Sequence, residues 1–180
     1  MLNLFTNSPI LRVDPDDLRK EFEGYIGGNA YIFQGAVSIL VSKILDYALA
    51  QRQSFLLDGT LVKLDVARSN VERSLEKGRF VQILYVYQSP LLAWEFVQAR
   101  EKAEGRKILV EHFVEQYFAA RDAVNALKLE YGKDVHVDLL LKHTDNSDRL
   151  YKAGIDKIDY HIPERFTRDQ LIAALGHVTC

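Results

Sequence analysis

Short apolar runs alternate along the chain with longer stretches in which apolar residues recur every three or four positions. The short runs have the length of strands, and charged residues, glycine or proline bound them. Four of these runs predict strands, at residues 10–13, 54–57, 80–87 and 135–141, and a fifth strand is expected at 157–162.

The longer stretches predict helices between these strands. At Asp14-Pro15-Asp16-Asp17 a proline and acidic residues stand where a helix begins. The stretch from Ala30 to Ala50 has a wide apolar face at helical spacing. Further helices are expected at residues 64–77, which Gly78 ends, from Pro90 to residues 104–106, at 110–129, and after a cap at Thr167.

Strands that alternate with helices are typical of βαβ units, in which successive strands run parallel and the connections are right-handed. The expected fold class is therefore α/β, with a mostly parallel sheet and helices on both faces. The chain shows no repeat, low-complexity segment or linker, so we expect a single domain over residues 1–180.

The composition narrows the functions open to such a domain. A formal net charge of −2 gives no bulk attraction to nucleic acid or to an anionic membrane, so neither is expected as a partner. No uninterrupted apolar stretch reaches the roughly 18 residues of a membrane helix. The only cysteine, Cys180, favours the cytoplasm. The five histidines match no zinc motif, so no metal site is expected.

Acidic residues follow two of the expected strands. Asp14, Asp16 and Asp17 come after the first strand, and Asp58-Gly59-Thr60 comes after the second. In open α/β sheets, ligands bind outside the carboxyl ends of the strands. The two segments therefore predict one site that holds a carboxylate base and a hydroxyl, as phosphoryl transfer requires. The alternative is purely structural, because the first segment also suits a helix start and Asp-Gly also suits a turn.

Two arginines form a second candidate group. Arg100 and Arg106 lie around the end of the helix that begins at Pro90, in a segment that contains Gly105. They have the chemistry to close over phosphates and to stabilise the charge on a transferring phosphoryl group. The alternative is a solvated helix end in which Glu101 and Glu104 are their partners.

These segments, in this order, resemble the zeta toxin family over nearly the whole chain. The resemblance is carried by Leu11-Arg12-Val13-Asp14-Pro15-Asp16-Asp17-Leu18-Arg19, Phe55-Leu56-Leu57-Asp58-Gly59-Thr60, Tyr85-Val86-Tyr87-Gln88-Ser89-Pro90, Ala99-Arg100-Glu101 and Glu104-Gly105-Arg106. It implies a P-loop kinase-like fold and a toxin–antitoxin context. It also implies that ATP and Mg²⁺ are used to phosphorylate the 3′-hydroxyl of UDP-N-acetylglucosamine or a similar UDP-sugar.

The resemblance implies a role for each candidate residue. Asp16 is similar to the base that accepts the proton of the sugar hydroxyl. Asp58 and Thr60 are similar to the substrate-binding corner, and Arg100 and Arg106 to the lid arginines that meet the phosphates. An antitoxin protein is the implied macromolecular partner.

The phosphate-binding motif G-x-x-x-x-G-K-[ST] of such kinases fits no window of these 180 residues. In the family this loop follows a central strand, which would lie between the second and third strands expected here. Three explanations are open: a truncated upstream segment, which we favour, a sheet that closes without this strand, or a partner chain that supplies it. We expect weak or absent kinase activity from this chain alone. The alternatives are a non-catalytic remnant that binds nucleotide sugars or proteins, and a kinase for another small hydroxyl substrate.

Overall fold

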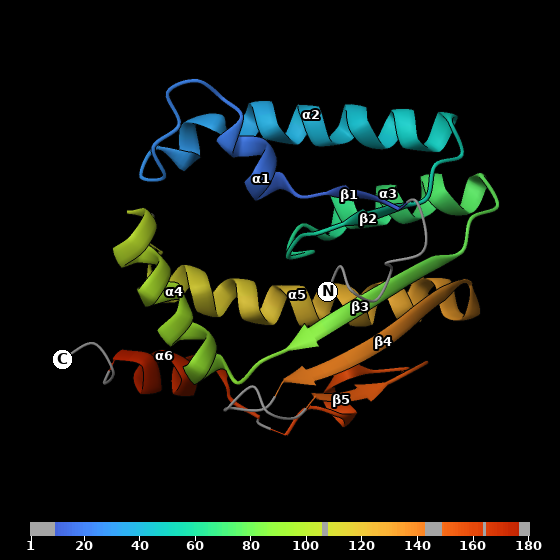
Figure 1. The fold of residues 1–180 in the computed structure, drawn as a ribbon. Helices are drawn as coiled ribbons and strands as arrows, with labels where there is room; N and C mark the ends of the chain where they lie inside the picture. The colour runs from blue at the N-terminus through green and yellow to red at the C-terminus, as the bar shows by residue number, and fades with distance from the viewer. Residues whose placement is uncertain (1–9, 106–107, 143–148, 164, 177–180) are drawn as a thin grey trace. The chain divides into compact units, whose positions relative to one another are not determined.

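The computed structural model describes residues 10–105, 108–142, 149–163 and 165–176 (Figure 1). The chain divides into two compact units, Met1–Gly59 with Glu104–Arg106 and Thr60–Ala103 with Lys107–Cys180. Each unit is described by itself. The single domain that the sequence indicates therefore stays a prediction.

The first unit is built on a pair of parallel strands. Strand β1 (Leu11–Val13) is followed by helices α1 (Pro15–Lys20) and α2 (Ala30–Ala50), and the chain then returns through β2 (Phe55–Leu57). Arg12 pairs with Leu56 in this ladder, and the backbone N–H of Asp58 donates to the carbonyl oxygen of Val13 over 2.9 Å. The parallel register brings the carboxyl ends of both strands to one edge, as the sequence predicts.

Helix α2 is apolar along most of its length. Its inner face buries Val37, Leu45, Ala48 and Leu49. By length and composition it is apolar enough to cross a membrane: an 18-residue window of the helix has a mean hydropathy of 1.4. Of that window, 22% is buried inside the protein. One such helix near the N-terminus is weak evidence for a membrane span, because core helices of soluble proteins pass the same test.

The described residues of the second unit form a sheet of three strands and four α-helices. In chain order its elements are α3 (Leu64–Glu76), β3 (Val81–Tyr87), α4 (Pro90–Glu104), α5 (Val110–Tyr131), η2 (Gly132–Asp134), β4 (Val135–Lys142), β5 (Arg149–Lys152), η3 (Ile158–Tyr160) and α6 (Arg168–Gly176). Strand β4 lies in the middle, parallel to β3 and antiparallel to β5.

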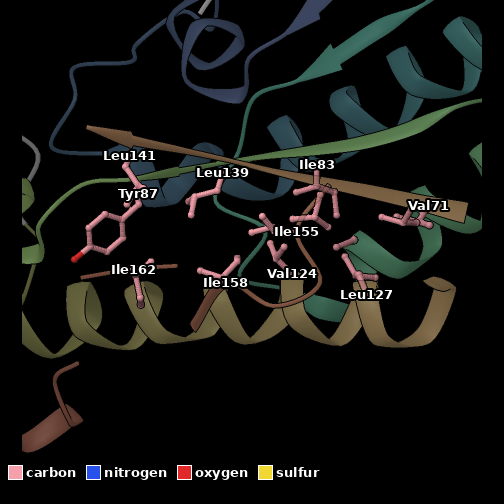
Figure 2. Packing of buried hydrophobic residues seen from close by; sticks show 13 residues of the cluster. Val71, Ile83, Tyr87, Val124, Leu127, Leu139, Leu141, Ile155, Ile158 and Ile162 are labelled. Carbon is pink, nitrogen blue, oxygen red and sulfur yellow. The ribbon is translucent and has the colours of Figure 1, made fainter. Parts of the chain in front are cut away.

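Side chains along β4 alternate between the two faces of the sheet, and the apolar ones show which face is buried. Val135, Val137, Leu139 and Leu141 lie on one face and pack against Val124 and Leu127 of α5 (Figure 2). The same cluster includes Val71 of α3 and a row of isoleucines from the segment after β5, Ile155, Ile158 and Ile162. Burial of this much apolar surface is the main source of stability in the unit.

A buried carboxylate joins the three strands on the opposite face. Asp138 of β4 is 4% exposed and accepts hydrogen bonds from the side chains of Gln82 in β3 and Tyr151 in β5. The backbone N–H of Gly154 donates to its other oxygen over 2.8 Å. These hydrogen bonds offset the cost of burying the charge.

A second apolar cluster lies where α4, α5 and α6 meet. Trp94, Phe118 and Leu171 belong to it, and Trp94 packs against Phe113 with ring centroids 5.2 Å apart. Helix α6 begins with the predicted cap: Thr167 Oγ1 accepts from the N–H of Gln170 over 3.2 Å, and Gln170 Oε1 accepts from the N–H of Thr167. The prediction of a cap at Thr167 is confirmed.

The α/β class is confirmed: among the described residues, the first unit holds the parallel pair β1-β2 and the second unit holds the sheet β3-β4-β5. One expectation needs correction. The strand predicted at 157–162 is wrong, because Ile155, Ile158 and Ile162 are spaced for a helical turn and all enter the core.

Candidate functional site

The start of α1 positions the acidic residues that follow β1. Asp14 is the N-cap, and its Oδ1 accepts from the backbone N–H of Asp16 over 2.9 Å. Pro15 occupies the first turn, and Asp16 and Asp17 are its acidic residues, which suits the positive end of the helix. The segment therefore starts a helix, as the structural alternative predicts, with Asp14 as its cap.

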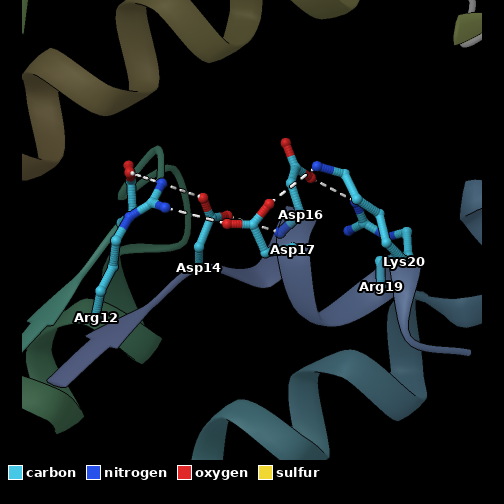
Figure 3. A network of polar contacts seen from close by, with 7 residues as sticks. Arg12, Asp14, Asp16, Asp17, Arg19 and Lys20 are labelled. Carbon is cyan, nitrogen blue, oxygen red and sulfur yellow. Dashed lines mark hydrogen bonds and ion pairs between the residues drawn. The ribbon is translucent and has the colours of Figure 1, made fainter.

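Arg12 connects this helix start to the end of β2. Its guanidinium donates to Asp14 Oδ2 over 2.5 Å, to Asp17 Oδ2 over 3.1 Å and to Asp58 Oδ2 over 3.2 Å. Figure 3 shows Arg12 pointing toward Asp14 and Asp17 from the strand. One cation thus holds three carboxylates, and we call Arg12, Asp14, Asp17 and Asp58 the Arg12 cluster.

The charges of the cluster shift the pKa of two of its members. The hydrogen bond to Asp58 is the largest cause that raises the pKa of Arg12 above its ordinary value. The hydrogen bond from Lys20 lowers the pKa of Asp17, with a further contribution from the charge of Arg12. Both shifts favour the charged forms of Arg12 and Asp17, which strengthens the ion pair between them.

Asp16 is held by a different arginine. Arg19 Nη1 donates to Asp16 Oδ1 over 2.5 Å, and Arg19 Nη2 donates to Gln34 Oε1 of α2 over 3.2 Å. Arg19 is buried, with 3% of its surface exposed, whereas 43% of the Asp16 side chain is exposed. The carboxylate therefore faces solvent while a buried guanidinium holds one of its oxygens (Figure 3).

The structure connects two of the five predicted site residues. Asp16 and Asp58 are linked through the Asp14 cap and Arg12, all within the first unit. Thr60 and Arg100 are exposed and belong to the second unit, so their placement against Asp16 is not defined. Arg106 lies outside the described residues.

Two site residues were missed from the sequence, Arg12 and Arg19. The contact between Arg12 and Asp58 spans 46 positions, so no local pattern could reveal it. The contact between Arg19 and Asp16 could have been predicted, because the two residues are three positions apart on one helix, a spacing at which side chains meet. The sequence could not show that its guanidinium is buried.

The described residues were tested for a metal site. Among them, no group of three or more His, Cys, Asp or Glu side chains is arranged to hold a metal ion. The three carboxylates of the Arg12 cluster share one guanidinium, so the cluster keeps a net negative charge. No window of the 180 residues fits the phosphate-binding motif G-x-x-x-x-G-K-[ST], and binding of ATP and Mg²⁺ stays an expectation.

Comparisons with known proteins bear on the family of the chain. A search of the curated proteins finds no match. The family profile described as Zeta toxin matches residues 2–156, which include both strand ends, the Arg12 cluster and the Asp16–Arg19 pair. Because this match covers most of the 180 residues, the chain belongs to the zeta toxin family.

Proposed function

We propose that this chain forms the acceptor side of a zeta toxin kinase, which binds UDP-N-acetylglucosamine or a similar UDP-sugar and orients a sugar hydroxyl for phosphorylation. Membership of the zeta toxin family itself indicates a kinase-like toxin function and a toxin–antitoxin context. The acceptor sugar, the antitoxin and the roles of individual residues belong to the proposal.

The observation that carries the proposal is the position of Asp16. Its carboxylate lies at the carboxyl end of a parallel strand, is partly exposed, and has one oxygen fixed by Arg19. A base needs this combination of access and fixed orientation to take a proton from a hydroxyl. Asp16 would accept the proton of the sugar hydroxyl while the hydroxyl oxygen bonds to the transferred phosphorus and the bond from that phosphorus to ADP breaks.

Asp58 and Thr60 would bind the sugar nucleotide. The Arg12 cluster holds the carboxylate of Asp58 at the end of β2, and Thr60 follows two residues later with an exposed side chain. A fixed carboxylate can accept hydrogen bonds from sugar hydroxyls, and a threonine hydroxyl can both donate and accept. Arg100 and Arg106 would contribute positive charge to the phosphates.

ATP and Mg²⁺ would supply the phosphoryl group and screen its charge when bound. The phosphate-binding motif G-x-x-x-x-G-K-[ST] fits no window of the 180 residues, so we propose the sugar side only for this chain. We therefore expect weak or absent phosphoryl transfer by the chain on its own.

The test restores a donor side and then removes the proposed base. A strand followed by G-x-x-x-x-G-K-[ST] and a helix would be fused ahead of Met1, and phosphorylation of UDP-N-acetylglucosamine would be followed by mass spectrometry. We expect transfer by the fusion and none by its Asp16→Asn variant. Full activity of that variant would remove Asp16 from the mechanism, and rapid turnover by the unfused chain would contradict the assignment to the sugar side only.

A second function is a binding protein without catalysis. The observation that favours it is the lack of any phosphate-binding motif in the 180 residues. Asp58 and the arginines would then hold a UDP-sugar or a protein regulator without turnover. UDP-sugar binding by calorimetry together with an inactive fusion would support this function over the first.

A further inference from the structure

Arg19 is an unusual residue to bury in a six-residue helix. It is 3% exposed, and its Nε is buried without a hydrogen-bond partner among the residues that the structure describes. Removing a guanidinium from water is costly unless charged and polar partners replace the water. Its known partners are the carboxylate of Asp16 and the side-chain oxygen of Gln34.

The ion pair is asymmetric. About four-tenths of the Asp16 side chain is exposed, against 4% of the Arg19 side chain, so Asp16 has water as an alternative partner and Arg19 has little. The arginine therefore depends on the aspartate for its charge balance, while the aspartate does not depend on the arginine. What Asp16 gains from the pair is a fixed orientation.

The orientation is set from two helices. Asp16 and Arg19 both lie on α1, three positions apart, and Gln34 approaches the same guanidinium from α2. A planar guanidinium with two anchored nitrogens can adopt few orientations, so the carboxylate oxygen bound to it is fixed as well. Gln34 thereby connects the position of α2 to the position of Asp16.

We propose that Arg19 is a positioning residue, which holds the carboxylate of Asp16 in one orientation and couples it to α2 through Gln34. The claim that this orientation serves a substrate rests on the proposed function. The fixed carboxylate is a property of the protein alone and can be measured separately.

The first experiment observes the carboxylates directly in the full chain. Aspartate is labelled with ¹³C at the carboxyl carbon, and Asp16→Asn identifies the Asp16 resonance. We expect Arg19→Met to shift and broaden this resonance and Arg19→Lys to restore part of its position. An Asp16 resonance that is the same in Arg19→Met and in the wild type would overturn the proposal.

Arg68→Met is the matched control. Arg68 donates to Asp65 over 2.9 Å, at the same three-residue spacing on a helix, but the Asp65 side chain is 98% exposed. We expect only a small change at the Asp65 resonance and none at Asp16. Circular dichroism checks that each variant is folded. If Arg19→Met is not, Arg19→Lys, which keeps the charge and retains Asp16, replaces it and should still shift the Asp16 resonance.

The second experiment titrates the same variants with UDP-N-acetylglucosamine by calorimetry. A carboxylate that is displaced by about an ångström loses most of its hydrogen bonding to the sugar. Arg19→Met should therefore weaken the affinity for UDP-N-acetylglucosamine at least about tenfold. Arg19→Lys should weaken it less, and Arg68→Met should leave it unchanged. Equal affinity in Arg19→Met and the wild type would overturn the positioning role. If the wild type itself does not bind, the proposed function fails, and the resonance of Asp16 still decides whether Arg19 holds it.

Discussion

The guanidinium of Arg12 lies 3.2 Å from the carboxylate of Asp58, across two parallel strands whose residues are 46 positions apart in sequence. This contact joins the end of β1 to the end of β2. It makes the two acidic segments of the chain one ionic cluster, because the same guanidinium also holds Asp14 and Asp17.

Arg12→Met tests whether the cluster serves binding or stability. Its members are partly exposed, and ion pairs of this kind contribute about 1 kcal/mol or less, so the free energy of unfolding should fall only slightly. Affinity for UDP-N-acetylglucosamine should fall about tenfold, because Asp58 loses the group that fixes it. Urea unfolding and calorimetry on the same sample measure both quantities.

Arg12→Lys is the control for charge. A lysine keeps the positive charge but cannot present a planar fork to three carboxylates, so it should restore stability better than affinity. A large loss of stability in Arg12→Met, about 3 kcal/mol or more, with unchanged affinity would mean that the cluster is structural.

The Asp16–Arg19 pair predicts an unusual order of stabilities. Asp16→Asn leaves a buried guanidinium without its counter-charge and should cost about 3 kcal/mol. The double variant Asp16→Asn/Arg19→Met should be more stable than Asp16→Asn, because the buried charge is gone. Urea unfolding followed by circular dichroism gives the order, and a double variant less stable than Asp16→Asn would contradict it.

This order also affects how the kinase test is interpreted. An inactive Asp16→Asn protein could have lost its base or its fold. An inactive double variant of restored stability shows that the lost activity comes from the missing Asp16–Arg19 pair and not from unfolding.

Asp138 predicts a pH dependence in the second unit. Burial alone would raise the pKa of this carboxyl, but hydrogen bonds from Tyr151, the Gly154 N–H and Gln82 outweigh it and lower the pKa below its usual range. A lowered pKa contributes stability above the unfolded-state value of about 3.9, and that stability is lost as the pH falls through the folded-state value.

Asp138→Asn should therefore be less stable than the wild type at pH 7, by about 1 to 3 kcal/mol, because an amide cannot accept all three hydrogen bonds. The difference should stay constant down to about pH 5 and shrink below about pH 4. The fluorescence of Trp94, which lies in the same unit, reports unfolding. Asp134→Asn at an exposed position is the control, and a difference that grows toward low pH would contradict the account.

Most elements of the fold could be predicted from local patterns. Helix α2 has the predicted limits, Ala30–Ala50, and the caps at Asp14 and Thr167 are where the sequence places them. These features depend on residues within one or two turns of each other, where spacing and capping chemistry decide the structure.

Features that depend on distant residues could not be predicted. The fifth strand was expected at 157–162, but β5 is Arg149–Lys152, and what holds it is pairing with β4 and the hydrogen bond from Tyr151 to Asp138. For the site, the local pattern indicated Asp16 and Asp58 as candidates. It could not indicate that Arg12 bridges Asp58 to Asp14 and Asp17, because parallel pairing of β1 with β2 brings these residues together.

Calorimetric titration of the purified chain with UDP-N-acetylglucosamine, without ATP, tests the central claim most directly. The claim that this chain is the sugar side of a zeta toxin kinase predicts saturable binding at one site, weakened at least about tenfold by Asp58→Asn and by Arg12→Met. The absence of any binding heat at millimolar UDP-sugar, from a chain shown to be folded by circular dichroism, would contradict it.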